Sequence, residues 1–316
     1  MSLYKKYKKI SKLKNRSDKS FNTVKLSQTS KHLIGINGKN HVAILFKASK
    51  PKGKEEHIRY LNLEHGIECT IFENKKKKIE KLSILKLSTN EENLKEIFLR
   101  SMDNIVLSLS NKISEKEIYD LTKNIIKLFE KIASKRNIDL IGLWGELFVI
   151  KILKAKDLLI EAWHPNPTDP FDFLIKNHAL EIKTTQKNDR KHIFKYEQLN
   201  SKNIDIIVGS VLIRKSRSGL SLLDLKDDIL KNIFNEDLKK KLQEMYDIYT
   251  GSKSQKELDE VKFSYDYAKD FIKFFDAKKI PRILETPMAG LKNINFESNL
   301  NGIENITNFS DYEFLQ

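Results

Sequence analysis

Hydrophobic and polar residues alternate over much of the first third of the chain. The stretches "HLIGINGKNHVAILFKAS" and "IRYLNLEHGIECTIFEN" each contain two runs of apolar or alternating residues, joined at Asn37-Gly38 and at His65-Gly66. Asparagine-glycine is a turn pair that can take up positive φ, and alternation with a period of two is typical of half-buried strands. The pattern therefore predicts a small antiparallel β-domain over about residues 29–90.

Helical periodicity follows this β-rich segment. Apolar residues in "NEENLKEIFLRSMDNIVLSLS" and "SEKEIYDLTKNIIKLFEKIAS" recur every three or four positions, which predicts two amphipathic helices. The next stretch, "IDLIGLWGELFVIKILKAK", is apolar on nearly all sides. Such a helix has no polar face to turn toward water, so we expect it to be buried.

The middle of the chain has the order of an α/β unit. "DLLIEAW" predicts a strand, and "FDFLI" and "ALEIKTT" predict a hairpin joined by "KNH". "HIFKY" predicts a short strand, and "IDIIVGSVLI" is rich in β-branched residues and predicts a buried strand.

The last third is predicted to be mainly helical. Two amphipathic stretches lie beyond Gly219, and an extended tail that packs back on the core is expected from Ile280 onward. The whole pattern predicts four parts: a basic arm over 1–28, a β-rich domain with connecting helices over 29–135, an α/β core over 136–218, and a helical region with the tail over 219–316.

The chain has a large excess of positive charge. The 316 residues include 58 Lys and Arg against 43 Asp and Glu, a formal net charge of +15. A fold does not need this excess, whereas a polyanionic partner such as nucleic acid would be attracted by it. The competing explanation is genomic, because abundant Lys, Ile and Asn are typical of AT-rich genomes.

Cysteine and apolar runs exclude some classes of protein. The single cysteine, Cys69, excludes an intramolecular disulfide framework and a multi-cysteine zinc site, and it fits a reducing cytoplasm. No stretch reaches the ~20 apolar residues that span a bilayer. The basic N-terminus lacks the apolar run of a signal peptide. We therefore expect a cytoplasmic protein without a membrane partner.

Candidate chemistry is concentrated in "LEIKTT". Side chains alternate along a strand, so Glu181 and Lys183 should share one face while Leu180 and Ile182 share the other. Acid-x-Lys is common in this lysine-rich chain, but Glu181 lies on a predicted interior strand, and Asp172 lies on the preceding strand of the same hairpin. Two adjacent carboxylates repel each other unless a cation lies between them. Oxygen ligands of this kind suit Mg²⁺.

Glu146 provides a third carboxylate. It lies within "GLWGELFVIKIL", where Leu143 and Ile150 should flank it on its own helical stripe. An unpaired buried carboxylate is costly, so we expect a partner or a metal there. The alternative is a stripe that faces water. A different role is expected for His164 and Trp163, which are more typical of a capped loop residue and of the core.

These residues resemble the PD-(D/E)XK nuclease superfamily, whose motif is an acid on a strand, a hairpin, then acid-x-Lys, often with a glutamate on the preceding helix. Asp172 would be the first acid, Glu181 and Lys183 the second element, and Glu146 the helical glutamate. The proline is not adjacent to Asp172, so Asp169 is a rival ligand.

Longer stretches resemble a bacterial family of PD-(D/E)XK motif proteins encoded beside DNA methyltransferases and ATPases in phage-defence clusters. They are "GLWGELFVI", "EIKTTQKNDRKH" followed by "EQL", and "IPRI", and the resemblance covers most of the chain. It implies an α/β, restriction-endonuclease-like core, a mixed sheet flanked by helices, with the N-terminal β-rich domain and the C-terminal helices added to it.

The resemblance also implies roles for individual residues. Mg²⁺, or Mn²⁺ in its place, would be held by Asp172, Glu181 and the Ile182 carbonyl, and Glu146 would support a second metal or bind a metal-bound water. Lys183 would orient the attacking water or stabilise charge on the phosphate. The remaining assignments are Arg190 as a phosphate contact, Gln198 as an accessory site residue, and His192 as either of these.

The function expected from the resemblance is that of a Mg²⁺-dependent endonuclease acting on DNA in a restriction or phage-defence system. The alternative is a non-cleaving nucleic-acid-binding or scaffold subunit built on a nuclease fold. The sequence does not separate DNA from RNA, since both present the same phosphates. It also leaves open a homodimer and partners from a defence operon.

Overall fold

The computed structural model describes most of the chain and divides it into two compact units. The described residues are 2–13, 17–48, 53–73, 76–106, 109–134, 139–164, 170–201, 203–285, 291, 293–309 and 312–315. The first unit comprises Met1–Asn137 and Asp247–Gln255, and the second comprises Ile138–Tyr246 and Lys256–Gln316. Among the described residues, no helix combines the length and the apolar character needed to cross a bilayer.

A six-stranded sheet forms the first unit. Its strands are β1 (Ser20–Lys25), β2 (Leu33–Ile36), β3 (Val42–Phe46), β4 (Glu56–His57), β5 (Leu61–Glu73) and β6 (Lys76–Leu87). The order is β1-β2-β3-β6-β5-β4, and β1 also pairs in parallel with β5, so the sheet closes on itself. The predicted hairpin at Asn37-Gly38 is confirmed, because β2 and β3 pair antiparallel.

Two helices complete the core of the first unit. Helices α2 (Glu92–Val106) and α3 (Glu115–Ser134) bury Phe98 and Phe129 in one cluster with strand residues such as Ile44. The two phenylalanine rings meet edge to face, with their centroids 6.3 Å apart. Both predicted amphipathic helices are therefore present, and their apolar faces form this core.

Two expectations for the first unit are wrong. His65-Gly66 is not a turn but a bulge within the single strand β5, where the register shifts between Glu64 and Ile67 and Gly66 has φ 65°. The expected basic arm contains α1 (Leu3–Ile10), whose Leu3, Tyr7 and Ile10 are buried, and it also contains β1. Buried apolar residues at helical spacing explain why Leu3–Ile10 forms a helix that packs on the core.

The second unit contains a mixed four-stranded sheet of order β13-β10-β8-β7. Its strands are β7 (Phe173–Ile175), β8 (His178–Thr185), β10 (Asp205–Leu212) and β13 (Lys273–Asp276). β7 and β8 form the predicted hairpin, β8 and β10 run parallel, and β13 pairs antiparallel with β10. The expected α/β class with a mixed sheet is confirmed.

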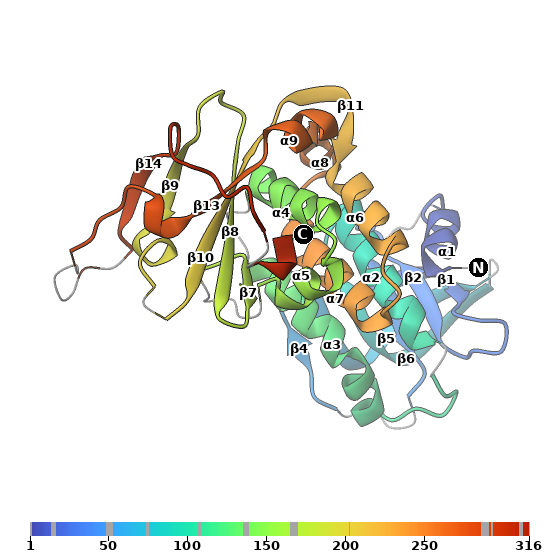
Figure 1. Ribbon diagram of the computed structural model, residues 1–316. Coiled ribbons are helices and arrows are strands. Elements are labelled where there is room, and N and C mark those ends of the chain that lie inside the picture. Colours follow the sequence, from blue (N-terminus) through green and yellow to red (C-terminus); the bar gives the residue numbers. More distant parts are fainter. Residues whose placement is uncertain are drawn as a thin grey trace. The chain divides into compact units, whose positions relative to one another are not determined.

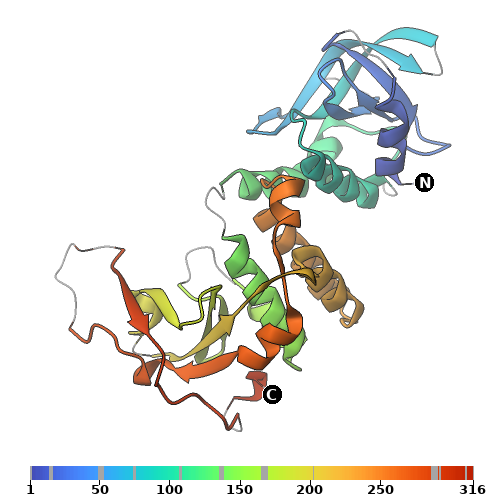
Figure 2. The same cartoon turned by 90° about the horizontal axis from the view of Figure 1, so that it is seen from above.

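The two faces of this sheet are covered differently. Helix α4 (Leu140–Ile152) lies on one side, and a ribbon of β9 (Lys191–Lys195) and β14 (Asn295–Asn299) lies on the other (Figures 1 and 2). Gly145 of α4 faces Ile182 and Thr184 of β8. Because side chains alternate, Glu181 and Lys183 point to the opposite face, away from α4.

The remaining elements of the second unit depart in part from expectation. "DLLIEAW" forms α5 (Lys156–Ala162) rather than a strand, and the C-terminal stretch expected to be helical ends in strand β13. The other elements are η1 (Tyr196–Gln198), β11 (Lys215–Ser221), α6 (Leu222–Lys231), α8 (Gln255–Asp259, at the boundary of the two units), β12 (Lys262–Phe263), α9 (Tyr265–Phe271), η2 (Ala277–Lys279) and η3 (Glu313–Leu315). Helix α7 (Glu236–Thr250) continues from one unit into the other along the chain.

Candidate active site

The second unit brings five of the predicted residues together. Asp172 directly precedes β7, Glu181 and Lys183 lie on β8, Gln198 ends η1, and Glu146 comes from α4. Three of these five residues lie on or beside the β7–β8 hairpin. A pair of antiparallel strands holds such side chains a few ångströms apart, as expected from the sequence.

Gln198 joins the two members of the acid-x-Lys pair. Lys183 Nζ lies 2.8 Å from Glu181 Oε1, which confirms that the two side chains share a face. Gln198 Nε2 donates to Glu181 Oε1 at 2.6 Å, and Gln198 Oε1 accepts from Lys183 Nζ at 3.0 Å. The amide is itself held, since Nε2 also donates to the Pro170 carbonyl and Oε1 accepts from the Lys195 N–H, both at 2.9 Å. The predicted accessory residue is thus a fixed bridge.

The second oxygen of the Glu181 carboxylate has no such support. Glu181 is 3% exposed, and its Oε2 is buried without a hydrogen-bond partner among the described residues. Burial raises the pKa of Glu181, and the nearby Lys183 ammonium opposes that shift. A buried carboxylate oxygen without a partner is costly, and a bound cation would remove the cost. Glu181 therefore fits the role of metal ligand.

Asp172 occupies the edge of β8 that β7 leaves open. The β7–β8 pairing extends only to Phe173 opposite Leu180. Beyond it, the Ile182 N–H donates to Asp172 Oδ2 at 2.7 Å. The N–H and C=O of one strand residue point to the same side, so the Ile182 carbonyl faces the Asp172 side as well.

The electrostatics of Asp172 also favour a cation. Loss of hydration and the negative charges of Glu181 and Glu146 raise the pKa of Asp172 well above its ordinary value, against the opposing effects of the Ile182 N–H and Lys183. Three carboxylates therefore act on one another in a site that withholds water. A divalent cation among them would favour their ionised forms.

Glu146 is buried and hydrogen-bonded, as its apolar surroundings led us to expect. It is 8% exposed, and its Oε2 accepts from Trp163 Nε1 at 2.7 Å and lies 3.0 Å from His164 Nε2. One ligand atom each from Glu146, His164 and Asp172 lie within 4.8 Å of one another. These three side chains could hold a metal ion.

His164 and Trp163 are the site residues that sequence reasoning missed. Each was expected to have a structural role, in a loop and in the core. Trp163 is fully buried, but it also donates to Glu146. His164 has φ 41°, a left-handed backbone that is uncommon outside glycine, and its N–H donates to the Asp172 carbonyl at 2.8 Å. No spacing in the sequence indicates either contact.

Arg190 and His192 do not have the positions expected of phosphate contacts. Both are buried and bonded to Ser210: Arg190 Nη1 donates to its carbonyl at 2.7 Å and to its Oγ at 2.9 Å, and His192 Nε2 lies 2.8 Å from that Oγ. Arg190 Nη2 also donates to the Phe271 carbonyl. Both side chains therefore have partners inside the protein, unlike the exposed position expected of a phosphate contact, and the alternative role of His192 as an accessory site residue stays a prediction. The rival ligand Asp169 lies outside the described residues.

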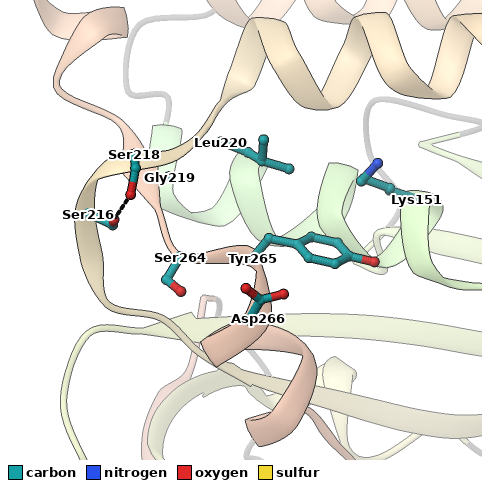
Figure 3. A pocket seen from close by; sticks show the side chains of 8 residues that line it. All are labelled: Lys151, Ser216, Ser218, Gly219, Leu220, Ser264, Tyr265 and Asp266. Atoms are coloured by element: carbon teal, nitrogen blue, oxygen red, sulfur yellow. Dashed lines mark hydrogen bonds between the residues drawn. The ribbon is translucent and has the colours of Figure 1, made fainter.

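A surface cleft of the second unit lies along β11, and no predicted site residue lines it. Its volume is about 340 Å³, and Figure 3 shows its lining: Lys151, Ser216, Ser218, Gly219, Leu220, Ser264, Tyr265 and Asp266. A neighbouring cleft of about 400 Å³ shares Ser216 and is lined by both cationic and acidic residues: Lys215, Arg217, Lys262, Asp259 and Glu260. Hydroxyl or charged groups of β11 thus line both clefts.

The comparison with known proteins agrees with the motif. Residues 3–301 match a protein family described as "Putative PD-(D/E)XK family member, (DUF4420)". This match confirms the resemblance to the PD-(D/E)XK superfamily, whose members are generally nucleases. No curated protein and no solved structure matches the chain.

Proposed function

The chain belongs to this PD-(D/E)XK family, and from that premise we propose that it is a divalent-metal-dependent endonuclease that hydrolyses DNA phosphodiester bonds. The observation that carries the proposal is the pair of Asp172, which is half-buried, and Glu181, which is buried, beside Lys183. Two carboxylates held close together in a site poor in water are unfavourable for folding alone. They become favourable when a cation and a phosphate are bound.

In this proposal the residues of the site have two roles: some bind the metal, and Lys183 acts on the water or the phosphate. Asp172, Glu181 and the Ile182 carbonyl would hold the metal, and Glu146 would support a second metal or bind a metal-bound water. When bound, a divalent cation polarises the scissile phosphate and lowers the pKa of a bound water. The Lys183 ammonium is fixed by Glu181 and Gln198, so it can orient that water or contact the charge that develops on the phosphate.

The charge of the chain supports a nucleic-acid substrate. The net charge is +15, and Arg214, Lys215 and Arg217 are exposed at the start of β11. The Ile213 N–H donates to the Thr185 carbonyl at 2.9 Å, so β11 begins just beyond the carboxyl end of β8. Ligands of open α/β sheets bind outside the carboxyl ends of the strands. We propose that these side chains contact the phosphate backbone.

Cleavage of supercoiled plasmid with Mg²⁺ or Mn²⁺ tests the proposal. We expect nicking by the wild-type chain and a loss of about a hundredfold or more in Lys183→Ala and in Asp172→Ala, because each change removes charge from the reacting centre. Lys278→Ala is the matched control, since Lys278 is exposed and pairs with Asp205. Cleavage that survives both site substitutions would place the activity elsewhere or in a contaminant.

The same experiment separates the alternatives. A non-cleaving binding subunit would retain salt-sensitive DNA binding without nicking under any metal condition. A ribonuclease of the same core would cut a single-stranded RNA and leave the plasmid intact. We also propose a role in restriction or phage defence. Phage plaque counts on cells expressing the wild type or Lys183→Ala test it, and equal counts would exclude a defence role for the cleavage site.

A further inference from the structure

The imidazole of His164 lies within the carboxylate cluster and gives it a nitrogen donor. Ligand atoms of Glu146, His164 and Asp172 lie within 4.8 Å of one another. We propose that these three residues form a site for a first-row transition-metal ion such as Mn²⁺, in preference to Mg²⁺. The catalytic meaning of this site rests on the proposed nuclease function, whereas the ion preference can be measured without nucleic acid.

Donor chemistry is the reason for the preference. Mg²⁺ binds almost only through oxygen and keeps several waters, so an imidazole contributes little to its affinity. First-row transition-metal ions accept nitrogen and oxygen ligands together. One imidazole with two carboxylates therefore shifts the preference of the site away from Mg²⁺ and toward these ions.

The position of His164 is built into the fold. Its backbone has φ 41°, and its N–H donates to the carbonyl of Asp172 at 2.8 Å. A left-handed backbone at a residue other than glycine persists only where its surroundings impose it, and such residues are concentrated at functional sites. The bond ties His164 directly to a residue that contributes a carboxylate to the same cluster.

A hydrogen bond from Trp163 fixes the orientation of Glu146. Trp163 Nε1 donates to Glu146 Oε2 at 2.7 Å, and that oxygen also lies 3.0 Å from His164 Nε2. Metal-binding side chains are commonly oriented by hydrogen bonds from residues that do not touch the metal. A bound cation would replace the direct contact between His164 and Glu146 and leave the Trp163 bond in place.

Glu181 provides a second, independent observation. Its Oε2 is buried without a hydrogen-bond partner among the described residues, and the residue is 3% exposed. The charges of Glu181 and Glu146 also act on each other. A cation held by Glu146, His164 and Asp172 would therefore be favoured by this neighbouring carboxylate as well.

Titration of the metal-free full chain with Mn²⁺ tests the proposal. Free Mn²⁺ is followed by electron paramagnetic resonance, with Mg²⁺ as competitor, and pulsed spectra report coupling to a ligand nitrogen. We expect wild type to bind Mn²⁺ about tenfold or more tightly than Mg²⁺, with nitrogen coupling present. His164→Gln should weaken Mn²⁺ binding on the order of tenfold to hundredfold and lose the coupling, since its amide oxygen leaves an all-oxygen site. His178→Gln is the matched control, because His178 is the first residue of β8 and lies outside the cluster.

The outcomes separate this inference from the proposed function. Absence of nitrogen coupling in wild type, or an unchanged preference for Mn²⁺ in His164→Gln, would overturn the inference even if the chain cuts DNA. Nitrogen-coupled Mn²⁺ that is lost in His164→Gln would support it, even if no phosphodiester is cleaved. In that case the proposed function alone would fail.

Discussion

Gln198 Nε2 donates to Glu181 Oε1 at 2.6 Å, so a residue 17 positions further along the chain fixes the acid of the acid-x-Lys pair. The same amide accepts from Lys183 Nζ at 3.0 Å. One side chain therefore sets the positions of both charged groups. Gln198 is thus a positioning residue for the site, rather than a group that must itself touch the substrate.

Replacing Gln198 tests this relationship. We expect Gln198→Ala to lower the rate of metal-dependent cleavage by about tenfold to hundredfold, because Glu181 and Lys183 lose the bridge between them. DNA affinity should change little, so the loss should appear in kcat and not in KM. Gln243→Ala, which removes an amide bonded to Lys226 at 3.3 Å, is the matched control. Full activity in Gln198→Ala would show that the bridge is dispensable.

A second prediction concerns the stability of the metal-free site. The pKa of Asp172 is raised by burial and by the charges of Glu181 and Glu146. The folded state therefore holds this proton more tightly than the unfolded chain does. The resulting stability is fully present below the ordinary carboxyl pKa of about 4 and is lost as pH rises through the raised pKa. At neutral pH the site thus opposes folding.

Asp172→Asn should remove this cost. We expect the variant, in EDTA at pH 7, to be more stable than wild type by roughly 1 kcal/mol, with the difference shrinking as pH falls toward 4. Mn²⁺ should then stabilise wild type but not the variant. Denaturant titrations with and without the ion measure both effects. A variant less stable than wild type in EDTA at neutral pH would contradict the prediction.

The hairpin and its chemistry could be predicted because they depend on local pattern. Alternation along β8 is enough to place Glu181 and Lys183 on one face, and the apolar surroundings of Glu146 are enough to indicate its burial. The contacts of Trp163 and His164 with Glu146 could not be predicted, since they join residues 17 and 18 positions apart through tertiary packing. A short apolar run such as "DLLIEAW" is also ambiguous between strand and helix.

Arg190 and His192 show a different limit. Because they follow the acid-x-Lys pair closely in sequence, we expected both side chains to lie near the substrate. However, β9 pairs with β14, and its residues alternate between buried and exposed positions, with His192 and Phe194 turned inward. The pairing joins segments about a hundred residues apart, and no local pattern indicates it. Which face of β9 is buried therefore had to come from the structure.

The burial of His192 leads to a third prediction. Burial, with the positive charges of Lys183 and Arg190, lowers the pKa of His192 to about 4. Above pH 6.5 the imidazole is neutral in both states. As pH falls from about 6.5 to 4, His192 becomes protonated in the unfolded chain but stays neutral in the folded state. The free energy of unfolding therefore falls by about 3 kcal/mol in total from this group.

His192→Gln should flatten this dependence, because glutamine can still accept from Ser210 and does not titrate. Denaturant titrations at several pH values between 7 and 4 measure the slope. His57→Gln is the control, since His57 is an exposed histidine in the other unit. Equal slopes for wild type and His192→Gln would mean that acid sensitivity has another source.

The last prediction concerns the close approach of α4 to β8, which positions Glu146 beside the hairpin. A Cβ at Gly145 would overlap the Thr184 hydroxyl and come within 3.4 Å of Ile182 Cγ2. Gly145→Ala should therefore destabilise the fold by about 1–3 kcal/mol, as overpacking does.

Gly142→Ala is the matched control on the same helix. Its Cβ would meet only Asp139, at 3.3 Å or more, and alanine favours the helix by about 1 kcal/mol. We expect denaturant midpoints to fall for the first variant and to hold or rise for the second. Equal midpoints would show that α4 can move away from β8, and cleavage by Gly145→Ala would then report whether Glu146 moves with it.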